Sequence, residues 1–171
     1  MRKLVCDQFE VAEILARSGA KRASEAALRR AVSTAYYGLF QALCEMSARS
    51  LVGRGQPWDV CTPIFRSLDH GWTRTQFSER AADKKHPLGI TVHEIGVAFT
   101  ELQGAREWAD YNPEPHPEAD EATGQKFARE EALALIETAR RAVSKLDGLD
   151  RTIQLKLAIR LVARTRKDAR R

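Results

Sequence analysis

The stretch LRRAVSTAYYGLFQAL, residues 28–43, decides the fold class of this chain. Apolar residues recur along it every three or four positions, and the pattern extends over residues 25–49. This is the spacing of one buried face of a long helix. Ser24 stands immediately before the pattern and is a residue type that caps helix N-termini. We therefore expect a long amphipathic helix whose apolar face packs against other helices.

The remaining chain shows the same helical periodicity in shorter segments and no convincing strand. The patterns predict further helices over residues 5–17, 58–68, 90–109, 124–146 and 150–167. Residues 72–87 lack periodicity and predict a mobile loop, and the proline-rich residues 109–123 predict a second loop. The expected fold is an all-α up-and-down bundle formed by residues 1–149. Residues 150–171 add a basic amphipathic helix, packed on the bundle or extending from it.

Composition fits one domain and argues against several classes of protein. The chain has 171 residues, of which 43% are hydrophobic, enough for a core without disulfides. Its three cysteines are widely spaced, and its histidines show no ligand spacing, so we expect no metal and no cofactor. No signal peptide or apolar run long enough for a membrane span is visible. We expect a reduced, cytoplasmic protein.

Positive charge is concentrated in the last 22 residues. Residues 150–171 contain eight Lys and Arg against two Asp, a net charge of +6, which leaves the other 149 residues at −1. Within this segment five basic residues fall within an arc of about 80° on a helix, namely Lys156, Arg160, Arg164, Lys167 and Arg171. Such a face could bind RNA phosphates, an acidic membrane surface or an acidic partner protein. It could equally be the solvated side of an ordinary packed helix.

Three stretches together resemble the HEPN superfamily. The long helix carries an arginine and then Ala-Tyr-Tyr-x-x-Phe at residues 35–40. Leu-Asp-His-Gly follows at 68–71, and REWADYNP at 106–113 places Arg-x-x-Ala-Asp-Tyr before a proline-containing loop. The resemblance covers residues 5–146. It implies a four- to five-helix bundle, usually a homodimer, linked to RNA as a toxin, an antiviral effector or a partner of a nucleotidyltransferase.

Active ribonucleases of that superfamily carry an arginine followed by a histidine after four to six residues. Two copies across the dimer form a metal-independent site, where arginine stabilises the transition state and histidine moves a proton. This chain departs from the motif, because Asp110 and Tyr111 stand where the histidine would follow Arg106. Arg80 and His86 fit the spacing but fall in the expected loop.

Each candidate site residue has a structural alternative. Arg106, Asp110 and Tyr111 form either a phosphate-binding site or a helix-end ion pair with a tyrosine packed under the loop, since positions 106 and 110 share a helix face. Asp69 and His70 form either an acid/base pair or the C-terminal cap of the helix before Gly71. Proximity of His70 to Arg106 or Asp110 would favour the site.

The expected function is a dimeric, RNA-associated or regulatory binding module of the kind found in toxin–antitoxin and defence systems. Its partners would be RNA, a cognate antitoxin or a nucleotidyltransferase protein. The alternative is a metal-independent endoribonuclease that uses Arg106 with His70 or Asp110.

Overall fold

A computed structural model of the chain describes residues 2–19, 23–78, 86–113 and 128–163. Within these ranges it contains seven helices and no strand: α1 (Arg2–Arg17), α2 (Glu25–Val52), α3 (Trp58–Ser67), α4 (His70–Ser78), α5 (Ile90–Tyr111), α6 (Arg129–Gly148) and α7 (Arg151–Val162). The all-α prediction is confirmed.

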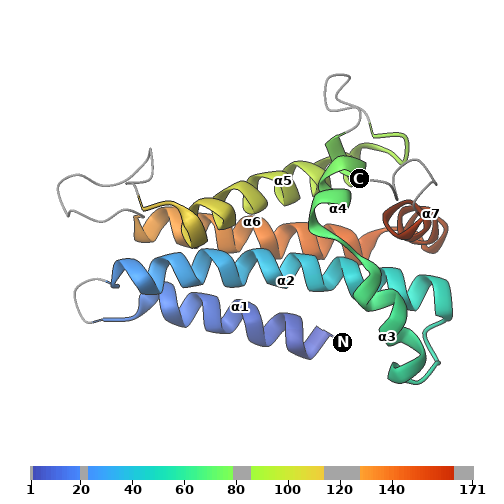
Figure 1. Cartoon of the computed structure of the whole chain (residues 1–171), viewed down its shortest axis with the longest axis horizontal. Helices are drawn as coiled ribbons and strands as arrows, with labels where there is room; N and C mark the ends of the chain where they lie inside the picture. The colour runs from blue at the N-terminus through green and yellow to red at the C-terminus, as the bar shows by residue number, and fades with distance from the viewer. Residues whose placement is uncertain (1, 20–22, 79–85, 114–127, 164–171) are drawn as a thin grey trace.

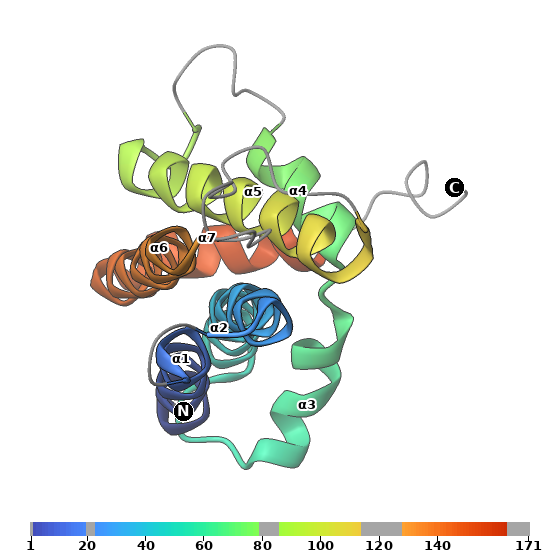
Figure 2. The same ribbon diagram turned by 90° about the vertical axis from the view of Figure 1, so that its left-hand side faces the viewer.

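Helix α2 is the central element of the bundle. It packs against α1, α3, α5, α6 and α7, and Figures 1 and 2 show it running through the middle of the molecule. Its buried side chains include Leu28, Tyr36, Leu39 and Leu43, each no more than 1% exposed. The N-cap prediction holds, because the Ser24 side chain accepts a hydrogen bond from the backbone N–H of Ala27. The decisive stretch of sequence thus forms the core of the fold.

Two glycines let neighbouring helices approach closely. A Cβ added to Gly38 in α2 would lie 2.6 Å from Cε1 of Phe9, so α1 can pack at this distance only if position 38 has no side chain. A Cβ on Gly96 in α5 would lie 2.8 Å from Cδ1 of Phe77 in α4. The second contact seats α4 against α5 and so helps to position the residue at the start of α4, His70.

Helix α4 contradicts two predictions. The sequence predicts a loop after residue 72, but the chain is helical as far as Ser78, and residues 79–85 lie outside the described residues. Asp69 and His70 are candidates for a helix C-cap by sequence, but Asp69 directly precedes α4 and His70 is its first residue. The Asp69 carboxylate accepts a hydrogen bond from the backbone N–H of Trp72 at 2.8 Å, as an N-cap does. Apolar periodicity misses this helix because its buried positions include Thr73 and Gln76.

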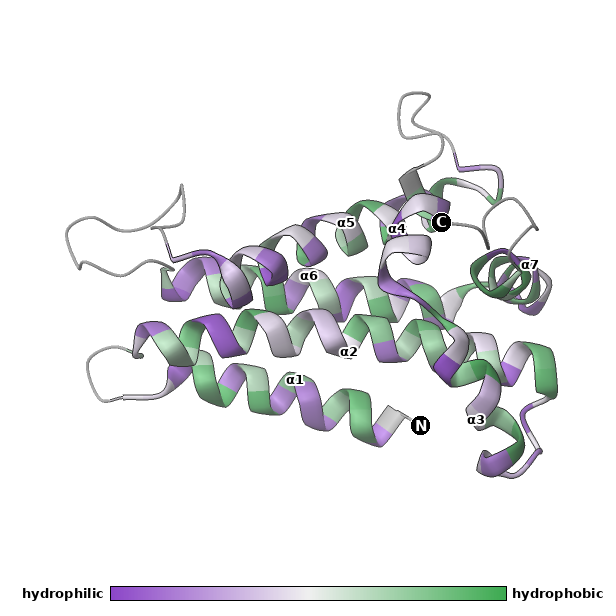
Figure 3. Cartoon of the chain, in the orientation of Figure 1, coloured by the Kyte–Doolittle hydropathy of each residue, from purple (hydrophilic) through white to green (hydrophobic). Residues whose placement is uncertain are grey.

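Amphipathicity is visible along the other helices, where hydrophobic and hydrophilic residues alternate in Figure 3. Two large apolar side chains are nevertheless exposed, Ile90 at the start of α5 and Ile159 in α7. Helix α7 packs on α2 and α4, which places the predicted basic helix against the bundle. No helix in the described ranges combines the length and the apolar character needed to span a membrane.

Candidate functional site

The sequence-predicted residues Arg106 and His70 meet at one aromatic cluster. Helix α2 contributes Tyr36, Tyr37 and Phe40, α4 begins with His70, and the last turns of α5 carry Arg106. The Arg106 guanidinium lies 5.9 Å from the ring centroid of Tyr36 and 5.5 Å from that of Tyr37. Since the His70 ring lies 5.6 and 6.1 Å from the same two rings, the two tyrosines join the arginine to the histidine. We call Tyr36, Tyr37, Phe40, His70 and Arg106 the tyrosine cluster.

Arg106 is held in place by Asp110 and Tyr37. Its Nε lies 2.9 Å from Oδ2 of Asp110, with side-chain exposures of 18% for the arginine and 24% for the aspartate. Its Nη2 donates a hydrogen bond to the Tyr37 hydroxyl at 2.8 Å. Among the described residues, Nη1 donates no hydrogen bond. The predicted i, i+4 ion pair therefore exists and orients the guanidinium.

The carboxylate of Asp110 holds Arg106 in position. One carboxylate oxygen accepts a hydrogen bond from the Ser33 hydroxyl of α2, and the other faces Arg106. Both oxygens are thus engaged by side chains of the protein itself. The contacts fit a residue that fixes Arg106 better than one that accepts a proton from a substrate.

Tyr111 lies at the surface of the same site. It is 73% exposed, its hydroxyl is 3.5 Å from Arg106 Nη2, and its ring centroid is 5.3 Å from the guanidinium. The expected alternative, a tyrosine packed under a loop, does not fit this exposure. A shallow depression beside it is lined by Gly104, Trp108 and Pro113, among others.

His70 is half-buried against aromatic rings. Its Nδ1 lies 2.6 Å from the Tyr36 hydroxyl, and the Phe40 ring centroid is 3.9 Å from that of the imidazole. Burial and, secondarily, the positive charge of Arg106 lower the pKa of His70 below its ordinary value, although the nearby Asp69 carboxylate opposes them. The lowered pKa favours the neutral imidazole at pH 7.

Arg29 is a residue of this region whose role sequence reasoning missed. From α2 it donates hydrogen bonds through Nη1 to the carbonyl oxygens of Ala109 at 3.0 Å and Asn112 at 2.6 Å. Its guanidinium also lies 4.7 Å from the Trp108 ring centroid, and its Nε pairs with Glu25 at 2.7 Å. These contacts satisfy carbonyls at the end of α5, where unpaired acceptors gather. Arg29 is visible near the start of the stretch of residues 28–43, but the carbonyl oxygen of Ala109 that it binds is 80 positions away in the sequence. No local pattern indicates this contact.

The other predicted residues lie apart from this cluster or outside the described ranges. His86 is 6% exposed, and its Nδ1 accepts a hydrogen bond from the backbone N–H of Leu88, while Arg80 lies outside those ranges. On α7, Lys156 is exposed and Arg160 is half-buried. Arg164, Lys167 and Arg171 lie outside the described residues, so the structure shows only the first two positions of the predicted basic face.

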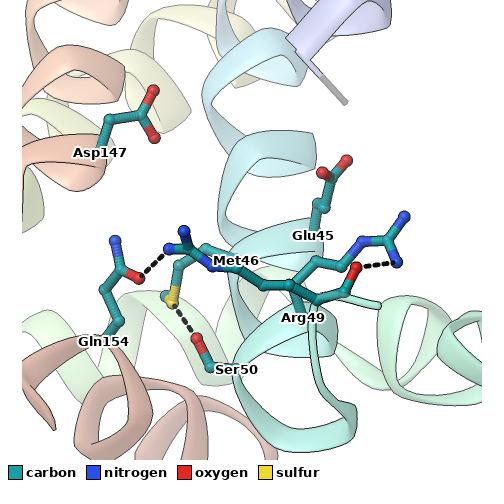
Figure 4. A pocket seen from close by; sticks show the side chains of 7 residues that line it. Glu45, Met46, Arg49, Ser50, Asp147 and Gln154 are labelled. Atoms are coloured by element: carbon teal, nitrogen blue, oxygen red, sulfur yellow. Dashed lines mark hydrogen bonds between the residues drawn. The ribbon is translucent and has the colours of Figure 1, made fainter. Parts of the chain in front are cut away.

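A separate pocket of about 470 Å³ lies at the C-terminal end of α2. Figure 4 shows Glu45 and Arg49 on one side of it and Asp147 and Gln154 on the other, and its full lining is Glu45, Met46, Arg49, Ser50, Arg54, Asp147 and Gln154. Arg54 Nη2 donates to Gln154 Oε1 at 3.2 Å. We call this the α2–α7 pocket. Sequence reasoning missed it because its residues come from three separate segments with no common motif.

Neither region offers a metal centre. Across the described residues, no three His, Cys, Asp or Glu side chains gather closely enough to hold a metal ion. The chemistry available here is anion binding by the Arg106 guanidinium, hydrogen bonding by the His70 imidazole and stacking on the exposed ring of the adjacent Tyr111.

Comparison with known proteins gives no relative: no protein-family model matches the chain, and no curated protein or solved structure is significantly similar to it.

Proposed function

We propose that this chain is a HEPN-like protein that binds single-stranded RNA through the end of α5. The resemblance supports this proposal through three stretches of sequence, and residues from all three meet in the tyrosine cluster: Tyr36 and Tyr37, His70, and Arg106. Residues so far apart in the chain are brought together only by the fold. Their meeting is what a shared binding site requires.

The observation that carries the proposal is the exposed Tyr111 ring beside Arg106. Proteins that bind single-stranded nucleic acids stack bases on exposed aromatic rings and hold the backbone with cations. Here a 73% exposed tyrosine lies 5.3 Å from a guanidinium whose Nη1 has no hydrogen bond within the described part of the chain. A base stacked on Tyr111 would place its phosphate close to Arg106. Duplex RNA, whose bases are already stacked on each other, cannot use the ring in this way.

The test is binding of a fluorescently labelled single-stranded RNA, measured by anisotropy at fixed salt. We expect Tyr111→Ala to weaken binding by roughly tenfold, because stacking of one base contributes about 1–3 kcal/mol. Tyr111→Phe keeps the ring and should retain most of the affinity. Arg106→Ala should weaken binding by a similar factor.

Arg141→Ala is the matched control for the loss of charge. Arg141 also forms an i, i+4 ion pair, with Glu137 at 3.9 Å, and its side chain is 67% exposed on α6. Equal losses from Arg106→Ala and Arg141→Ala would show that only net charge matters. Such a result would contradict a site at the tyrosine cluster.

The basic segment at the C-terminal end supplies a second, less specific contribution. In this proposal Lys156 and Arg160, continued by Arg164, Lys167 and Arg171, attract the RNA backbone. Replacing Lys156 and Arg160 by Gln should lower affinity for all RNA sequences and reduce its salt dependence. A cognate antitoxin or a nucleotidyltransferase protein is the proposed protein partner, in a cytoplasmic setting.

The proposal includes a homodimer, but α2 is poorly placed to form it. Helix α2 is covered by five helices of its own chain, whereas α1 exposes Leu4, Val11 and Ile14, which are 57%, 48% and 68% exposed. We therefore place the dimer contact on α1. Light scattering at micromolar concentration should give twice the chain mass, and Ile14→Asp should shift it to the monomer. A monomer mass for the unmodified chain would contradict this part.

Metal-independent RNA cleavage is a second candidate, favoured by the proximity of His70 and Arg106. In that reaction the 2′-oxygen attacks the adjacent phosphorus and the bond to the 5′-oxygen breaks, giving a 2′,3′-cyclic phosphate and a 5′-hydroxyl. The 2′-hydroxyl loses a proton, the leaving oxygen gains one, and Arg106 would stabilise the charged transition state. Cleavage of labelled tRNA and single-stranded RNA in EDTA, lost in Arg106→Ala, would establish it. Absence of cleavage by the unmodified chain would leave the binding module.

A further inference from the structure

The direction of the hydrogen bond between Tyr36 and His70 is argued from the burial of the tyrosine hydroxyl. The Tyr36 side chain is 1% exposed, and its hydroxyl lies 2.6 Å from Nδ1 of His70. Within the described residues this nitrogen is the only acceptor that the hydroxyl reaches. Because a buried O–H group needs an acceptor, the hydroxyl donates and Nδ1 accepts.

The protonation state of the tyrosine is consistent with this direction. Burial raises the pKa of Tyr36 far above its ordinary value, although the nearby Arg106 opposes the shift. The phenol therefore keeps its proton at physiological pH. In a neutral imidazole whose Nδ1 is an acceptor, the single ring proton is on Nε2.

We propose that Tyr36 positions His70 as a fixed, neutral hydrogen-bond donor, whose Nε2–H group is offered to a phosphate oxygen of the RNA bound beside Arg106. This inference rests on the proposed function and assigns a role to one residue of that site. Tyr36 acts through His70 and is a positioning residue.

The surroundings of the ring oppose its protonation. The groups that face His70 are Tyr36 and Tyr37 from α2, Arg106 from α5, and Asp69 from the turn before α4. Phe40 covers the ring at 3.9 Å between centroids. A protonated imidazole would need to donate from Nδ1 to the Tyr36 oxygen, and the tyrosine proton would then lose its acceptor in a buried place. Of these charged neighbours, Asp69 alone favours the protonated form.

This arrangement separates binding from catalysis. Nε2 already carries a proton, so it cannot remove one from a 2′-hydroxyl, and Nδ1 is occupied by Tyr36. A neutral donor can, however, bind a phosphate oxygen next to the Arg106 guanidinium without adding a second positive charge. The inference therefore favours the binding module over a ribonuclease in which His70 is the general base.

The experiment is a two-bond ¹⁵N–¹H correlation spectrum of the full-length, ¹⁵N-labelled chain, which reports the tautomer of each histidine. His70 is identified by the signals missing in His70→Gln. We expect an Nε2–H tautomer in the unmodified chain. In Tyr36→Phe, Nδ1 loses its donor, so both tautomers should appear and the pKa of His70 should move upward toward its ordinary value.

Tyr37→Phe is the matched control, because the Tyr37 ring faces His70 but its hydroxyl accepts from Arg106. It should leave the His70 tautomer unchanged. An Nδ1–H tautomer in the unmodified chain, or identical titrations of Tyr36→Phe and the unmodified chain, would overturn the inference. If Tyr36→Phe does not fold, a slowly exchanging Tyr36 hydroxyl proton with a nuclear Overhauser effect to His70 decides the matter, and its absence counts against the inference.

RNA binding provides the functional half of the test. His70→Gln retains an N–H donor near the position of Nε2, so it should bind RNA within a fewfold of the unmodified chain at every pH. His70→Ala should lose affinity. If the unmodified chain binds no RNA, the proposed function fails, while the spectra still establish whether Tyr36 fixes the tautomer.

Discussion

The middle and the C-terminal end of α2 show that a sequence motif and a pocket can lie in different places. Near its middle, α2 carries the tyrosine cluster, where aromatic rings, Arg106 and His70 contact one another directly. Near its C-terminal end, the α2–α7 pocket leaves an open space of about 470 Å³ between charged side chains. Only the first region has a recognisable sequence pattern. The residue pattern therefore leads to the first region and gives no sign of the second.

Large-to-small substitutions test whether the two regions really differ in packing. Tyr36→Ala should destabilise the fold by about 3–5 kcal/mol, because it removes a buried aromatic ring from close contacts. Met46→Ala in the pocket wall should cost about 2 kcal/mol, the low end for a buried methionine, because open space already adjoins it. Urea denaturation measures both. Equal losses would show that the pocket wall is packed as tightly as the tyrosine cluster.

Glycine substitutions, whose expected effect on stability is smaller, compare a tightly packed position of the bundle with an open one. Gly38→Ala should destabilise the fold by roughly 1–3 kcal/mol through overpacking against Phe9. Gly104→Ala, in α5 with no atom within 4 Å of an added Cβ, should instead stabilise the helix by about 0.5–1 kcal/mol. Thermal unfolding followed by circular dichroism distinguishes the two signs. Recovery of Gly38→Ala by a second change, Phe9→Leu, would identify the contact responsible.

Removal of one partner of a polar contact should also destabilise the fold more at the tyrosine cluster than at the α2–α7 pocket. Asp110→Ala leaves a largely buried Arg106 without its carboxylate, and we expect a loss of about 1–3 kcal/mol. Arg54→Ala breaks only the 3.2 Å hydrogen bond to Gln154 beside an open pocket, at a cost of about 1 kcal/mol or less. The same denaturation measurement applies. A larger loss from Arg54→Ala would reverse the ranking of the two regions.

The smallest expected effect is a pH dependence of the free energy of unfolding, which comes from His70 and His86 and not from the pocket. His70 has a lowered pKa in the folded chain, so the unfolded chain binds more protons as the pH falls. The free energy of unfolding is therefore at its full value above the ordinary histidine pKa of about 6.5 and decreases as the pH falls below it. His86, whose pKa burial also lowers, contributes in the same direction.

Unfolding titrations of His70→Gln, His86→Gln and the unmodified chain between about pH 7.5 and 5 would separate the two contributions. The slope of stability against pH should decrease in each histidine variant. Arg54→Ala, in a pocket without a histidine in its lining, should retain the full slope. A free energy of unfolding that rises as the pH falls would contradict a lowered pKa for both histidines.

The fold class was predictable from sequence because apolar periodicity is strong where helices are long. The pattern over residues 25–49 located α2 within three residues of its observed end at Val52, and Ser24 marked its start. Helix α4 could not be found in this way, since Thr73 and Gln76 occupy buried positions that the pattern expects to be apolar. Helix α7 was found, but it is shorter than predicted within the described residues, ending at Val162.

The candidate site was predictable in part. Spacing along α5 correctly gave the Arg106–Asp110 ion pair, because positions four apart are neighbours on any helix. The contacts of Arg106 with Tyr37 and of His70 with Tyr36 depend on how α2, α4 and α5 dock, which no local spacing encodes. The contacts of Arg29 and the α2–α7 pocket also depend on how helices dock, so sequence spacing could not predict them.

Arg29 caps the carbonyl oxygens at the end of α5 from another helix. Many helices end at a glycine whose own backbone turns the chain, but here a side chain of α2 collects the carbonyl oxygens of Ala109 and Asn112. The final turn of α5 is therefore a product of tertiary assembly, and a synthetic peptide of this helix alone would fray there. Tyr111 is the last residue of this turn, so its place beside Arg106 would depend on the same contacts. Any RNA affinity that depends on Tyr111 would then also depend on the packing of α5 against α2.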